Sequence, residues 1–132
     1  MRGHAMPKIS KDSTPDVRDF GLAVDRSGHL ADDYTVDFVT IRQSHSLAEM
    51  LRGLPGDRCP CPHWGYLFTG KITVSYSDHE EVFEAGDAFY MAPGHVPAAE
   101  AGSDFVQFSP KAQLAEVQAV MMANAQRAMQ GT

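Results

Sequence analysis

The chain has 132 residues, a formal net charge of −6 and a sequence pI of about 5.4. This length fits one domain, and the acidic balance argues against a nucleic-acid partner. No apolar stretch is long enough for a membrane span, and the first residues lack the apolar run of a secretory signal. We therefore expect a cytoplasmic protein with no membrane partner, in which Cys59 and Cys61 stay reduced.

Polar residues and two prolines fill the beginning of the chain. We expect a loose arm over 1–16, followed by a single domain over 17–132. A short strand is predicted at 20–24 and a turn at 25–28, because aspartate, serine and glycine favour turns. Apolar and polar residues then alternate over 34–41, which predicts a longer strand.

Short strands dominate the second half of the chain. The even-numbered residues Tyr66, Phe68, Ile72 and Val74 are predicted to share one face of a strand, with Gly70 marking a bend. Further strands, each bounded by Gly or Pro turns, are predicted at 80–83, 88–91, 96–99 and 105–108. This spacing is typical of an all-β sandwich or barrel ending near residue 108.

A helix is predicted at the end of the chain, over 110–129. Ser109 suits the N-cap and Pro110 suits the first helical position. Apolar residues recur at helical spacing, including several methionines, and we expect them to pack outside the barrel or against a second subunit.

The segment Cys59-Pro60-Cys61-Pro62-His63 combines two thiols and an imidazole. Proline keeps its neighbours extended, and side chains of an extended segment alternate between faces. Cys59, Cys61 and His63 are therefore predicted to point the same way. Such a face is a candidate metal site, and it is equally consistent with two cysteines that fill the core.

Two segments resemble the conserved motifs of the cupin superfamily. Residues 63–74 (HWGYLFTGKITV) resemble the first motif and residues 86–95 (GDAFYMAPGH) resemble the second. The resemblance implies a double-stranded β-helix barrel with a ligand or metal site inside its mouth, and often a homodimer. The sequence closely resembles a group of single-domain, largely uncharacterised bacterial cupins.

The chain departs from the ligand pattern of that family. The first motif is G-x5-H-x-H-x3-4-E-x6-G, and aligning its last glycine with residue 70 puts His63 at the glutamate position. The two motif histidines then fall, depending on the spacing chosen, on Asp57 and Cys59 or on Gly56 and Arg58.

The second motif departs in the same way, because Pro97 stands where its histidine is expected and His95 lies two positions earlier. The usual set of three histidines and one glutamate is therefore absent. The chemistry of a standard iron, manganese or nickel cupin enzyme does not transfer to this chain.

A metal site would have to be built from Cys59, Cys61, His63 and His95. Sulfur and imidazole donors favour zinc among the divalent metals. Alternatively, the histidines tie backbone carbonyls at the barrel mouth, and His63, His95 and Tyr90 are candidates for acid–base catalysis. Candidate pocket-lining residues are apolar or aromatic: Tyr66, Phe68, Tyr90 and Met91.

Three functions remain open from the sequence. The chain is read as a small barrel with an internal pocket for a small molecule or metal. The alternatives are a zinc-type enzyme acting on a small polar metabolite and a non-catalytic structural or sensor protein. A homodimer is the expected assembly.

Overall fold

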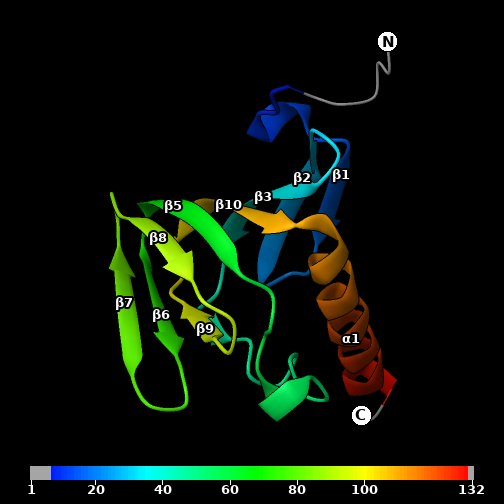
Figure 1. Ribbon diagram of the computed structural model, residues 1–132, viewed down its shortest axis with the longest axis vertical. Helices are drawn as coiled ribbons and strands as arrows, with labels where there is room; N and C mark the ends of the chain where they lie inside the picture. The colour runs from blue at the N-terminus through cyan, green and yellow to red at the C-terminus, as the bar shows by residue number, and fades with distance from the viewer. Residues whose placement is uncertain (1–6, 131–132) are drawn as a thin grey trace.

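The computed structural model describes residues 7–130 and consists of two antiparallel sheets and one long helix (Figure 1). The larger sheet has the spatial order β1 (Asp16–Asp19), β2 (Ala23–Leu30), β3 (Tyr34–Ile41), β10 (Asp104–Pro110), β5 (His63–Thr69) and β8 (Ala88–Met91). The smaller sheet has the order β4 (His45–Ser46), β9 (Val96–Ala99), β6 (Lys71–Ser75) and β7 (Glu80–Glu84). The remaining elements are α1 (Lys111–Gln130) and two 3-10 turns, η1 (Lys11–Ser13) and η2 (Pro55–Asp57).

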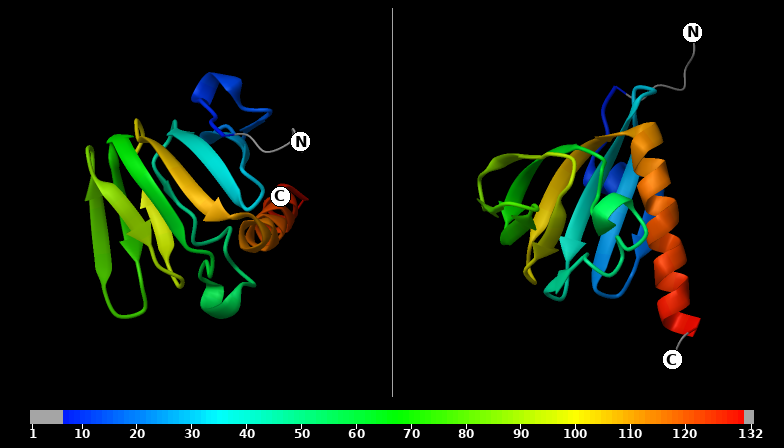
Figure 2. Two further views of the ribbon diagram at one scale, coloured as in Figure 1. Left: turned by 45° about the horizontal axis from the view of Figure 1, so that its top comes forward. Right: turned by 60° about the horizontal axis from the view of Figure 1, so that its bottom comes forward.

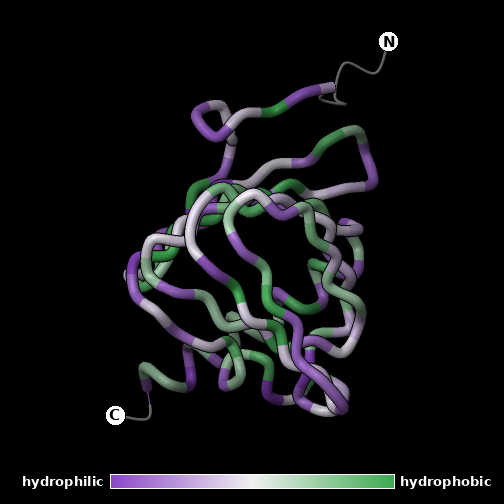
Figure 3. Tube along the Cα trace, turned by 90° about the vertical axis from the view of Figure 1, so that its left-hand side faces the viewer, coloured by the Kyte–Doolittle hydropathy of each residue, from purple (hydrophilic) through white to green (hydrophobic). Residues whose placement is uncertain are grey.

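The predicted all-β architecture with a C-terminal helix is confirmed. Figure 3 shows the chain curving around a common interior. Both views of Figure 2 place α1 beside the larger sheet, away from β6 and β7. In residues 7–130, no helix combines the length and the apolar character needed to cross a membrane.

The N-terminal segment packs on the outside of the larger sheet. Residues 1–6 of the predicted loose arm lie outside the described residues, whereas Lys11 Nζ lies 3.3 Å from the Asp104 carboxylate. Gly28 lies under this segment, because a Cβ at that position would overlap Ile9 and Pro15. The arm therefore contacts the sheet through residues on both sides of η1.

The first hairpin differs from its prediction. The predicted turn at 25–28 lies inside β2, where every residue pairs with β3. The chain instead turns at 31–33, with Ala31 in the left-handed region at φ 54. Asp25 and Ser27 lie on the inner polar face of the sheet, and Gly28 packs closely against Ile9 and Pro15. These tertiary contacts explain why residue types that favour turns occur inside a strand.

The side-chain alternation of β5 runs opposite to the predicted one. His63 and Leu67 are buried, while Tyr66 and Phe68 are 41% and 49% exposed. Gly70, at φ 90, then turns the chain into the other sheet, where Ile72 and the residues in phase with it are buried. The prediction treated β5 and β6 as one strand, and the turn reverses which positions face the core.

Two apolar clusters stabilise the molecule. The first fills the space between the sheets and comprises Ile41, Leu67, Ile72, Val74, Phe89, Met91 and Phe105. The second joins α1 to the segment before β5 and comprises Leu51, Cys59, Cys61, Leu114 and Val117. The Asn124 side-chain amide also donates hydrogen bonds to the carbonyls of Met50 and Arg52, at 2.7 and 2.8 Å. The helix is thus fixed to the loop that precedes the site.

Two carboxyl groups lie on the inner face of the larger sheet. Asp37 is 2% exposed, and Asp25 lies beside it on the neighbouring strand. Burial and the nearby Asp25 carboxylate raise the pKa of Asp37 to about 9. Burial also raises the pKa of Asp25. Asp37 therefore carries a proton at neutral pH, since two adjacent buried carboxyls cannot both ionise cheaply.

We expect the free energy of unfolding to fall as the pH rises from about 7 to about 8.5. Asp37 keeps its proton in the folded chain over this range and loses it in the unfolded chain. One proton gives a slope of at most about 1.4 kcal/mol per pH unit. Urea denaturation should show that Asp37→Asn lacks this part of the slope.

The exposed carboxyl Asp12 provides the control, because Asp12→Asn should keep the wild-type slope. Identical pH slopes for wild type and Asp37→Asn would contradict a protonated Asp37.

Candidate metal centre and its cavity

Two distant segments are joined by backbone hydrogen bonds at the barrel mouth. The Cys59 amide donates to the His95 carbonyl at 3.0 Å, and the Gly94 amide donates to the Cys59 carbonyl at 2.8 Å. His63 is the first residue of β5, four positions after Cys59. These bonds place a thiol and two imidazoles on one side of the interior.

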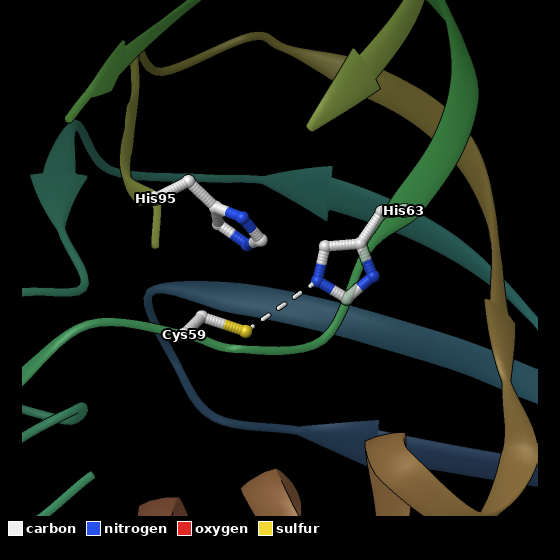
Figure 4. A group of neighbouring side chains, drawn as sticks. All are labelled: Cys59, His63 and His95. Carbon is white, nitrogen blue, oxygen red and sulfur yellow. Dashed lines mark hydrogen bonds between the residues drawn. The ribbon is translucent and has the colours of Figure 1, made fainter. Parts of the chain in front are cut away.

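Cys59, His63 and His95 form a compact group of buried donors (Figure 4). One ligand atom from each residue lies within 4.8 Å of the other two. Cys59 Sγ lies 3.7 Å from His63 Nε2, and the two imidazole rings meet edge to face with centroids 4.9 Å apart. Sequence reasoning predicted these three residues, and the fold brings them together.

Each imidazole is held through its Nδ1 atom. His95 Nδ1 lies 2.6 Å from the Ala92 carbonyl oxygen, which can only accept, so this nitrogen carries the proton. His63 Nδ1 lies 2.7 Å from the hydroxyl of Ser109, which is fully buried. Nε2 of His95 is consequently unprotonated, and Nε2 of His63 is unprotonated when Nδ1 donates to Ser109, which leaves it able to accept from the Cys59 thiol. This is how ligating histidines are commonly oriented.

Burial sets the charge of the group. Burial, and then the neighbouring His95, lowers the pKa of His63 to about 3. Burial likewise lowers the pKa of His95 and raises the pKa of the Cys59 thiol. At neutral pH both imidazoles are neutral and the thiol keeps its proton. A bound metal cation would leave Cys59 as a thiolate, because metal binding displaces the thiol proton.

Cys61 does not join the donor group among the described residues. Its sulfur lies 3.5 Å from the Pro62 carbonyl oxygen, and its side chain belongs to the apolar cluster with Leu51 and Leu114. The expectation that Cys59 and Cys61 point the same way assumed an extended segment, whereas the chain bends at Cys61. Burial, followed by the nearby Cys59 and Asp37, raises the pKa of Cys61 to about 12. Cys61 is an inert core residue.

A cavity of about 630 Å³ adjoins the donor group. Cys59, His63, His95 and Met91 line it. Its volume lies in the range that accommodates small organic ligands.

The predicted pocket-lining residues Tyr66, Phe68 and Tyr90 are not among its walls. They lie on the outer face, where the Tyr90 ring packs against Trp64 at 5.2 Å between centroids. This placement removes Tyr90 from the candidates for acid–base catalysis. For Tyr66 and Phe68 the error is the reversed alternation of β5, whereas Tyr90 lies on the opposite face of β8 from the buried Met91.

Three functional residues were missed by the sequence reasoning. Ser109 suits a helix N-cap, yet it belongs to β10 and holds His63. Asp25 and Asp37 line the cavity from β2 and β3. Asp37 carries a usable signal, because it is a charged residue within a strand whose neighbours are mostly apolar or β-branched.

No protein-family model matches the chain, and no curated protein sequence matches it. Solved structures do resemble it. A protein of unknown function from Rhizobium leguminosarum bv. viciae 3841 has 19% identity and a TM-score of 0.57 over 80% of this chain and 96% of its own. An RmlC-like cupin from Shewanella frigidimarina NCIMB 400 has 16% identity and a TM-score of 0.53 over 77% and 88%.

Oxalate decarboxylase from Bacillus subtilis is also similar, with 14% identity and a TM-score of 0.58 over 80% of this chain and 29% of its own. At these identities the likeness concerns the arrangement of the backbone. It confirms the fold implied by the two sequence motifs, and the chain has the cupin fold: a small β-barrel around an internal cavity.

Proposed function

We propose that the chain is a zinc-dependent enzyme that binds Zn²⁺ through Cys59, His63 and His95 and accepts a small molecule in the adjoining cavity. The main support is that three buried side chains place potential metal-ligand atoms within 4.8 Å of one another. Sulfur and nitrogen ligands of a tetrahedral zinc lie about 3.6 Å apart. The 3.7 Å between Cys59 Sγ and His63 Nε2 agrees with that spacing.

The composition of the donor set supports zinc and an open coordination position. One thiolate and two neutral imidazoles suit zinc better than the harder Mg²⁺ or Ca²⁺. Three protein ligands leave a fourth position, as in catalytic zinc sites, and all three residues also line the cavity. A bound zinc would supply Lewis-acid chemistry to whatever occupies that position.

The remaining residues of the site have distinct tasks. Ser109 and the Ala92 carbonyl fix the two imidazole rings through Nδ1. The apolar cluster beneath Cys59 excludes water from the sulfur. Asp37 holds a proton at the cavity wall and is placed to exchange it with a bound molecule.

Zinc binding is tested by a matched pair of cysteine variants. The purified wild type should bind one zinc per chain, and Cys59→Ala should lose at least about 100-fold in affinity, since it removes one of three ligands. Cys61→Ala changes an equally buried thiol outside the donor group and should retain wild-type affinity. Competition with a chromophoric chelator measures both. Loss of zinc from Cys61→Ala alone would refute this ligand set.

Ser109 is a positioning residue, and its removal should weaken zinc binding without removing a ligand. Ser109→Ala leaves His63 Nδ1 without its partner, so we expect the zinc affinity to fall about 10- to 100-fold. Ser103 offers a control, because it is also fully buried and its hydroxyl bonds to Lys71 instead. If Ser109→Ala and Ser103→Ala weaken zinc binding equally, the effect is structural and Ser109 has no specific role.

We also propose that two copies of the chain associate through the outer face of β5 and β8. Four aromatic side chains there are 41–49% exposed: Trp64, Tyr66, Phe68 and Tyr90. Sedimentation velocity should give the mass of two chains, and Tyr66→Ser with Phe68→Ser should shift the mass to one chain, because burial of apolar surface drives association. A wild-type mass of one chain at micromolar concentration would rule the dimer out.

A further inference from the structure

The inner face of the larger sheet carries a row of polar residues next to the donor group. Asp37 of β3 pairs with Ser27 of β2 and with Gln107 of β10. Asp25 lies on the same face of β2, two positions before Ser27. Asp25, Asp37 and Gln107 all line the cavity that Cys59, His63 and His95 also line. The cavity therefore has a polar end inside the barrel.

The carboxyl oxygens at this end lack hydrogen-bond donors. Within residues 7–130, the only protein donor near both oxygens of Asp37 and the Oδ1 atom of Asp25 is the proton that this carboxyl pair itself holds, although all three atoms are buried. An unsatisfied buried polar atom costs about 1–3 kcal/mol. Such atoms are rare in folded proteins, so these three call for hydrogen bonds from a water or ligand in the cavity. Even with the one proton that Asp37 holds, the two carboxyl groups have more acceptor positions than donors, so an occupant that donates hydrogen bonds suits them.

The opposite end of the cavity is apolar. Its walls come from the turn between β1 and β2, the loop after β4 and α1, and include Phe20, Leu22, Leu47, Met50, Met121 and Ala125. Methionine side chains adapt to ligands of varied shape. An apolar chamber of this kind is a poor place for ordered water, which needs polar partners. The two ends thus require different chemistry from a single occupant.

We propose that the cavity binds an amphipathic small molecule whose head group donates hydrogen bonds to Asp37 and Asp25 and whose hydrocarbon part lies beneath α1. This rests on the proposed function only in placing the ligand in the same cavity as the metal centre. Hydroxyl and amine head groups share the required donor chemistry. A carboxylate head group does not, because it would bring further acceptors to a wall that already has them in excess.

Binding of matched probes to the zinc-free wild-type chain tests the proposal. Isothermal titration would compare 1,2-octanediol, n-octylamine, octanoate and the short 1,2-propanediol. We expect the diol or the amine to bind at least about 10-fold more tightly than octanoate. The octanediol should bind more tightly than the propanediol by about fourfold per buried methylene. A preference for the amine would identify an ammonium head, and a preference for the diol would identify a hydroxylated one.

The variant Asp37→Asn supplies the specific control. The amide has two N–H donors and one acceptor oxygen, whereas the protonated carboxyl has one O–H donor and two acceptor oxygens. Donor-headed probes should therefore bind more weakly than to wild type, and octanoate should bind more tightly. Asp12→Asn, on the outside of the molecule, should leave all four affinities unchanged. The proposal is overturned if no probe binds, if octanoate binds to the wild type as tightly as the other long-chain probes, or if chain length has no effect.

Zinc titration is a separate measurement, so the two proposals can fail independently. A chain that binds the long-chain diol or amine and no zinc refutes the metal centre and keeps the amphipathic ligand. A chain that binds zinc and none of the probes keeps the metal centre and refutes the amphipathic ligand.

Discussion

The two backbone hydrogen bonds between Cys59 and the turn at 94–95 determine the rest of the site. They connect the segment before β5, which belongs to the larger sheet, with the segment before β9, which belongs to the smaller one. Gly94, at φ 97, lets the turn bring its amide to the Cys59 carbonyl. The bridge fixes His95, which precedes β9 of the smaller sheet, beside Cys59 and His63 of the segment that enters β5. The donor group is therefore a consequence of how the barrel closes.

Closure also determines the protonation of the site. Burial keeps His63 and His95 neutral and keeps the Cys59 thiol protonated, which are the forms that a dry interior tolerates. Neutral imidazoles are ready to bind a metal, whereas the thiol must lose its proton first. The same burial retains a proton on Asp37. An interior built this way holds protons on Cys59 and Asp37, which both line the cavity.

The sequence predicted the repeated features of the fold and missed those that depend on tertiary contacts. Alternation and turn residues located most strands, and helical spacing located α1, because these signals are local. The turn at Gly70 carries the chain into the other sheet, and this reversed the prediction for Tyr66 and Phe68. Tyr90 and Met91 were both predicted to line the pocket, but neighbours in a strand point to opposite faces. The alternation of residues along a strand does not show which of its two faces is buried in the folded protein.

The donor group shows the same division. Cys59, His63 and His95 were identifiable because thiols and imidazoles are uncommon and were clustered near the motifs. Cys61 was wrongly predicted to share a face with Cys59 and His63. The chain bends at Cys61, and nothing in the sequence Cys-Pro-Cys-Pro-His indicates that bend. Ser109 was assigned to the helix it precedes, and only the pairing of β10 with β5 brings it to His63.

The distribution of buried polar groups argues against a purely structural barrel. A barrel selected only for stability would fill its interior with apolar side chains, as the region around Ile72 and Phe105 does. The wall formed by Asp25, Asp37 and Gln107 instead holds two buried carboxyl groups with more acceptor positions than donors beside the cavity. Each such group lowers the stability of the folded chain, and none is needed to close the sheets. Their concentration on one wall, facing three potential metal ligands, is what a binding site requires and a packing core avoids.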